Sequence, residues 1–149
     1  MKLSSSAFLN NQNIPKKFGF NYENMNPPLL IEDVPPKTKS LVLIMDDPDA
    51  KAAVGKIWVH WLLWNISPTT TEICENSIPL NSVQGINDFE EIKYGGPAPP
   101  DKEHVYFFKL YAISKSLDIP TGSTKTILEK EISDCILEQT TLTGKYFPQ

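Results

Sequence analysis

Residues 57–67 read IWVHWLLWNIS, a run in which large apolar side chains stand at nearly every position. The two-residue period of a β-strand divides the run into two bulky faces, one with Trp58, His60, Leu62 and Trp64 and the other with Val59, Trp61 and Leu63. Because both faces are bulky, we predict a central strand in a layered protein, with one of the chain's two histidines among its aromatic residues.

Two further runs have the composition of strands. The first is SLVLIMD, residues 40–46, which is short, apolar and partly β-branched, and it stops at the polar DDPDA. The second is HVYFFKLYAIS, residues 104–114, which places His104, Tyr106 and Phe108 on one face and Val105 and Phe107 on the other. The connection over residues 68–93 is long for a compact domain, so it predicts short strands or a functional loop.

Only one stretch has a clear helical period. Its apolar residues recur at helical spacing, and Thr126 with Glu129 three residues later has the pattern of a capping box. The periodic set is Ile127, Leu128, Ile132, Cys135 and Ile136. We therefore predict an all-β protein, an antiparallel sandwich with one peripheral helix of about three turns near the C-terminus.

Composition and charge narrow the class of protein. The 149 residues favour a single domain over 1–149, and the 13 prolines favour short segments joined by shaped loops. A net charge of −4 without any arginine argues against nonspecific nucleic-acid binding. No apolar run predicts a membrane span or a secretory signal, so we expect a cytoplasmic protein. Cys74 and Cys135 lack CxxC partners, and we expect free thiols.

Polar groups gather where the predicted strands begin and end. They are Asp46, Asp47, Asp49, His60, His104 and Tyr106, and the Gly-Pro-rich YGGPAPP, residues 94–100, lies just before the last two. Each residue taken alone has a structural explanation, as a turn carboxylate, a hydrogen-bonded core histidine or a core tyrosine. Trp58 fits the wall of a site or the core equally well.

Three kinds of site are possible for these polar residues, and the sequence does not support them equally. A metal site lacks HxH or HExxH spacing, and a nucleophile lacks a GxSxG elbow. A small anion-binding pocket would use imidazole N–H groups, the Tyr106 hydroxyl and the backbone N–H groups of Gly95 and Gly96. An aspartate bound to one imidazole nitrogen would leave the other N–H aimed into that pocket.

The motifs DPDA (47–50), WVHW (58–61) and YGGPAPP followed by HVYFF together resemble the phosphatidylethanolamine-binding protein family, which includes Raf kinase inhibitor protein. The match is closest to its bacterial and archaeal branch and covers nearly the whole chain. It departs from the family at Val105, where an arginine is common, and at Glu90 and Lys93, which are often glycine in that branch.

The resemblance implies a Greek-key antiparallel β-sandwich whose pocket takes phosphate or phospholipid headgroups. Carried over by position, the ligand-binding residues are Asp47, Asp49, Trp58, His60, Gly96, Pro97, His104 and Tyr106. We expect a non-enzymatic anion-binding protein without cofactor, metal or catalytic residues, which regulates a partner protein. Inhibition of a serine protease or kinase through the surface is the alternative, and a metal-assisted or acid/base hydrolase is the third. The resemblance also makes a homodimer plausible.

Overall fold

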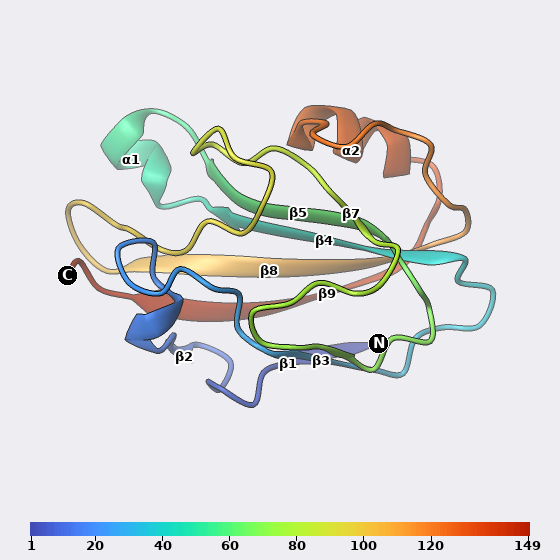
Figure 1. Ribbon diagram of the computed structural model, residues 1–149, viewed down its shortest axis with the longest axis horizontal. Helices are drawn as coiled ribbons and strands as arrows, with labels where there is room; N and C mark the ends of the chain where they lie inside the picture. The colour runs from blue at the N-terminus through green and yellow to red at the C-terminus, as the bar shows by residue number, and fades with distance from the viewer.

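A six-stranded sheet runs through the middle of the computed structural model, which describes residues 1–149 (Figure 1). Its strands, in spatial order, are β2 (Gln12–Asn13), β9 (Ile136–Tyr146), β8 (His104–Ile113), β4 (Ser40–Asp47), β5 (Trp58–Ile66) and β7 (Val83–Gln84). Every pair is antiparallel except the short parallel pair of β2 with β9. The three strands predicted from apolar runs are β5, β4 and β8, and they are direct neighbours.

A second, three-stranded sheet covers one face of the large sheet. It consists of β1 (Lys2–Ser4), β3 (Leu29–Glu32) and β6 (Glu72–Ile73). The core between the sheets takes Leu3, Ile31 and Ile73 from the small sheet and Trp61 and Phe108 from the large one. The short strands β6 and β7 lie in the long connection, where short strands were predicted. A mainly β protein with a C-terminal helix is confirmed, whereas the Greek-key connectivity stays a prediction.

Helix α2 (Lys125–Ile132) covers the opposite face of the large sheet (Figure 1). Its buried side chains, Leu128 and Ile132, pack into a second core with residues of β4, β5 and β8. The N-cap is Thr124, whose hydroxyl oxygen accepts a hydrogen bond from the backbone N–H of Ile127 at 3.3 Å. The predicted capping box of Thr126 and Glu129 is therefore wrong, because the helix begins before Thr126.

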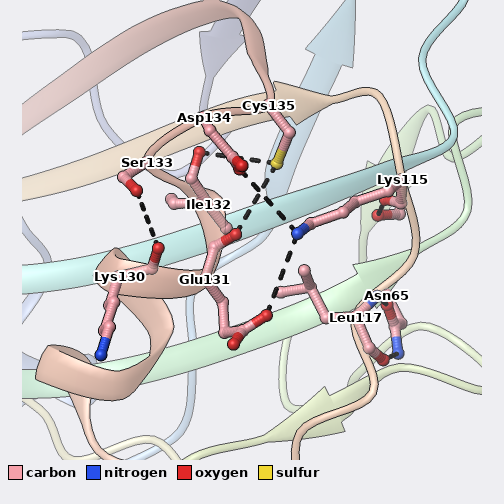
Figure 2. A network of polar contacts seen from close by, with 10 residues as sticks. Asn65, Lys115, Leu117, Lys130, Glu131, Ile132, Ser133, Asp134 and Cys135 are labelled. Atoms are coloured by element: carbon pink, nitrogen blue, oxygen red, sulfur yellow. Dashed lines mark hydrogen bonds and ion pairs between the residues drawn. The ribbon is translucent and has the colours of Figure 1, made fainter.

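The helix also ends earlier than the apolar spacing predicts. Ser133 is its C-cap, and the Ser133 hydroxyl donates to the carbonyl of Lys130 at 2.8 Å. The backbone N–H of Cys135 donates to the carbonyl of Ile132 at 3.1 Å, which completes the turn. Figure 2 shows this turn beside the ammonium group of Lys115. Apolar residues after Ile132 belong to the turn and the next strand, so the helix has 8 residues.

Strand β9 is the largest element that the sequence did not predict. Its first six residues are exposed or half-buried, and only Leu142, Gly144 and Tyr146 are buried in its second half. Such a strand at the side of a sheet shows little apolar alternation, because its polar side chains face water. The two cysteines are free thiols, as predicted, with Cys135 buried and Cys74 exposed.

Strand β5 contains a bulge that changes the predicted division of its faces. Met45 pairs with Trp61 and the next residue of β4, Asp46, pairs with Val59, so His60 is the extra residue. After the bulge Trp61 and Leu63 face the core between the sheets, while Leu62 and Trp64 face α2. The prediction that His60 shares a face with Leu62 and Trp64 is therefore wrong, although Trp58 and His60 do line the same cavity.

A short helix, a loop and the C-terminus lie together at one end of the molecule. Helix α1 (Ala50–Val54) follows β4 and ends at Gly55, whose φ of +85° is a left-handed conformation that glycine adopts without strain. The helix was not predicted, because DDPDA was interpreted as the end of a strand and a turn. Figure 1 shows α1, the loop before β8 and the C-terminus at this end, and the 3₁₀ turn η1 (Lys16–Phe18) precedes the small sheet's second strand. No helix has the length and apolar character needed to cross a membrane.

Candidate functional site

A cavity of about 230 Å³ opens at this end of the large sheet, where β4 ends and β8 begins. Its lining is mostly hydrophobic and consists of Asp47, Ala50, Ala53, Val54, Trp58, His60, Phe89, Ala98, Pro100, His104 and Tyr106. The structure thus brings together these predicted site residues: Asp47, Trp58, His60, His104 and Tyr106. It does not place Asp49, Gly96 or Pro97 in the lining.

His104 is held between two carboxylates. Its Nδ1 lies 2.7 Å from Asp47 Oδ2 and its Nε2 lies 2.7 Å from Asp101 Oδ1. Burial alone would lower the pKa of His104, but its hydrogen bonds to Asp47 and Asp101 outweigh burial and raise it. Burial also raises the pKa of Asp47, and a ring that donates to two ionised carboxylates is an imidazolium. The prediction that an aspartate would leave the other N–H free is therefore wrong for His104, because Asp101 accepts it.

His60 has the opposite electrostatic character. Its Nδ1 lies 2.7 Å from the carbonyl oxygen of Gly95, and the backbone N–H of Gly95 donates to the carbonyl of His60 at 2.9 Å. The ring is buried, and burial lowers the pKa of His60 to about 4. The two histidines of the chain therefore sit in one cavity as one neutral and one charged ring.

Two polar atoms of the cavity walls are buried without a hydrogen-bond partner. They are the hydroxyl of Tyr106 and the indole Nε1 of Trp58. The Tyr106 hydroxyl lies near the Asp47 carboxylate but makes no hydrogen bond of normal geometry with it. Burial, followed by the negative charge of Asp47, raises the pKa of Tyr106, so the phenol keeps its proton and remains a donor. An unsatisfied buried donor costs about 1–3 kcal/mol, and such an atom in a cavity wall marks a place for a ligand oxygen or water.

The remaining predicted residues support the cavity from outside. The Asp49 carboxylate accepts the backbone N–H of Val105 at 2.8 Å, which ties the end of β4 to the start of β8. A Cβ on Gly96 would stand 2.0 Å from the carbonyl oxygen of Phe18, so this position requires glycine for close backbone approach. Pro97 lines a neighbouring hollow on the other side of the loop.

The expected backbone donors of the Gly-Pro loop are already engaged. Gly95 N–H donates to His60 and Gly96 N–H donates to the side-chain oxygen of Asn24 at 2.8 Å. These bonds fix the loop to β5 and to the N-terminal segment. The prediction that the two N–H groups point at an anion is wrong, because both already donate hydrogen bonds within the protein.

Sequence reasoning missed the residue that organises the cavity wall formed by Phe89. Asn87 is buried; its Oδ1 accepts the N–H groups of Phe89 and Glu91, and its Nδ2 donates to the carbonyl of Lys93 at 2.8 Å. This turn gives Glu90 a left-handed φ of 63°. It holds the Phe89 ring against His60, with centroids 5.6 Å apart.

Asp46 lies outside the cavity, although it precedes Asp47 directly. Its carboxylate faces α2 and accepts from Lys109 Nζ at 2.9 Å and from Lys125 Nζ at 2.8 Å. Neighbouring residues of a strand point to opposite faces, so only one of the two aspartates can reach the site. The cavity lining contains no serine, threonine or cysteine, and no group of three His, Cys, Asp or Glu side chains is placed to hold a metal ion.

The fold and the cavity define a class of two-sheet β protein that encloses a neutral histidine and a histidine–aspartate pair at one end of its larger sheet. The model of the phosphatidylethanolamine-binding protein family matches residues 4–147. The chain therefore belongs to the phosphatidylethanolamine-binding protein family, as its motifs indicated.

Relatives from archaea and bacteria agree with this assignment. The chain is 40% identical to a UPF0098 protein of Methanothermobacter thermautotrophicus, with 98% of both chains covered. Its structure resembles the phosphatidylethanolamine-binding protein homologue CT736 of Chlamydia trachomatis, with a TM-score of 0.90, 38% identity and coverage of 97% of this chain and 95% of the other. It also resembles YbcL of E. coli, a member of the same family, with a TM-score of 0.92, 26% identity and coverage of 99% and 98%.

Proposed function

We propose that the cavity binds a small phosphate-like anion, either free or as part of a phosphorylated molecule such as a phospholipid headgroup, and that the protein is a cytoplasmic binding protein rather than an enzyme. The observation that carries this proposal is the pair of unpartnered buried donors, Tyr106 and Trp58, in the wall of a cavity that also contains His60 and His104. An anionic oxygen would accept the hydrogen bonds that the protein leaves unmade.

The lining supports binding more than chemistry. Neither histidine has a serine, threonine or cysteine beside it to activate, and His104 is engaged by carboxylates at both nitrogens. The apolar walls from Ala53, Val54 and Phe89 suit the uncharged part of a phosphorylated molecule. Family membership supports ligand binding in general. Regulation of a partner, inhibition of a protease or kinase, and hydrolysis stay predictions.

The test is a titration with inorganic phosphate and, separately, with phosphoethanolamine, followed by NMR of the histidine rings. Binding should shift the ring signals of His60 and His104, and Tyr106→Phe should weaken binding about tenfold, since it removes one donor to a charged group. Tyr111→Phe is the matched control, because Tyr111 lies on the same strand but faces the second core. Histidine signals that stay unchanged at saturating ligand would refute the proposal.

A further inference from the structure

The hydrogen bond of His60 to the Gly-Pro loop fixes which ring nitrogen carries the proton. A carbonyl oxygen can only accept, so the Nδ1 atom 2.7 Å from Gly95 O must be the N–H. The reciprocal bond from the Gly95 N–H to the His60 carbonyl holds ring and loop together. Since the buried ring is neutral, Nε2 carries a lone pair, and the hydrogen bond of the ring is made at Nδ1. The site therefore contains an unused acceptor beside its two unused donors.

The charges around the cavity disfavour a doubly negative ligand. No lysine lines it, and the positive charge of His104 is already shared between two carboxylates. The ionisable groups that bear on His60 come from β4, the loop before the Gly-Pro segment, and β8, and they are Asp46, Asp47, Asp88, His104 and Tyr106. Asp46 is already paired with Lys109 and Lys125, and Asp88 with Lys56, so these groups bring no free cation to the cavity. A second negative charge on the ligand would be repelled without a matching cation.

We propose that this cavity selects oxyanions that carry a proton, that is, the monoanion of a phosphate monoester, whose P–OH donates to His60 Nε2 while its other oxygens accept from Tyr106 and Trp58. The inference rests on the proposed anion site and adds its selectivity. His60 is then the specificity-determining residue. Phosphate diesters and sulfate have no such proton near neutral pH, and they bind only if His60 takes one up.

Two isomeric ligands separate the proton from size and charge. Ethyl phosphate and dimethyl phosphate contain the same atoms, and at about pH 5 both are monoanions, since a monoester loses its second proton near pH 6. Only ethyl phosphate then has a P–OH. Both are titrated against the wild-type protein in phosphate-free buffer. Because the two titrations use the same pH, His104 has the same protonation state in the free protein in both.

Ethyl phosphate should bind about tenfold more tightly at about pH 5, because dimethyl phosphate must first protonate a ring whose pKa is about 4. The ratio should widen to about a hundredfold at about pH 7, since protonating His60 becomes harder by tenfold per pH unit while ethyl phosphate loses its proton only above about pH 6. His60→Phe, which keeps a ring but removes the acceptor, should bring the two affinities together.

The outcomes are distinct. Equal wild-type affinities for the two isomers overturn the selectivity and leave anion binding intact. Failure of both isomers to bind overturns the anion site as well. Because the decisive comparison uses the wild-type protein, a folding defect in His60→Phe does not affect it.

Discussion

Replacing Tyr106 by phenylalanine should make the ligand-free protein more stable. The Tyr106 hydroxyl is fully buried without a hydrogen bond of normal geometry, and the nearby Asp47 carboxylate compensates its desolvation only weakly. Removing an unsatisfied buried polar group recovers about 1 kcal/mol of the 1–3 kcal/mol penalty, since some of it is offset by lost packing. For a chain of this size about 1 kcal/mol corresponds to a rise in Tm of about 2–4 °C.

Tyr94→Phe is the matched comparison and should have the opposite sign. The Tyr94 hydroxyl is also buried, but it donates to the carbonyl of Phe18 at 2.9 Å. Its removal leaves that carbonyl without its donor and should lower the free energy of unfolding by about 1–2 kcal/mol. Both variants are measured by thermal and denaturant unfolding in phosphate-free buffer. If Tyr106→Phe destabilises as much as Tyr94→Phe, the hydroxyl has a partner and the argument for a ligand-ready donor is refuted.

Three further variants test the electrostatics and the packing around the cavity. Asp101→Asn should lower the pKa of His104, measured by NMR from its ring signals. The raised pKa of His104 stabilises the folded state at pH values below the ordinary pKa of histidine, and this stabilisation is lost as the pH rises through the raised pKa. The loss of stability over that pH range should therefore be smaller in Asp101→Asn. Asp46→Asn should cost about 3 kcal/mol in denaturant unfolding, because it leaves two lysine ammonium groups without their shared buried carboxylate. Gly96→Ala should destabilise by about 3 kcal/mol or more through its clash with backbone, whereas Gly55→Ala, in open space at φ +85°, should cost only about 1 kcal/mol.

The first two of these variants have matched controls. Glu103→Gln removes a neighbouring carboxylate that does not contact His104, so the pKa of His104 should move less than in Asp101→Asn. Asp134 is exposed and lies 3.9 Å from the nearest ammonium nitrogen, so Asp134→Asn should change stability by less than about 0.5 kcal/mol. Equal effects of a variant and its control would contradict the role assigned to the buried contact.

Much of the fold was predictable because its central strands are apolar on both faces. The runs that became β4, β5 and β8 are buried in the middle of the sheet, and burial on both faces leaves a strong signal in sequence. Strand β9 was missed because half of it faces water. The helix was placed correctly but extended too far, since an apolar period does not stop where a serine cap and a turn stop the helix.

The sequence by itself indicated five of the residues that line the cavity, namely Asp47, Trp58, His60, His104 and Tyr106. The order of its motifs indicated the family, and the strand period put His104 and Tyr106 on one face. Only the tertiary structure decided what those residues can do. Asp101 lies three residues before His104 in a loop, and no periodicity reveals that its carboxylate takes the ring's second N–H. The bulge at His60 and the carbonyl of Gly95 likewise set that ring's proton through contacts between distant segments. Hydrogen bonds and charge states depend on distances of a few tenths of an ångström, which folding fixes and residue types alone do not.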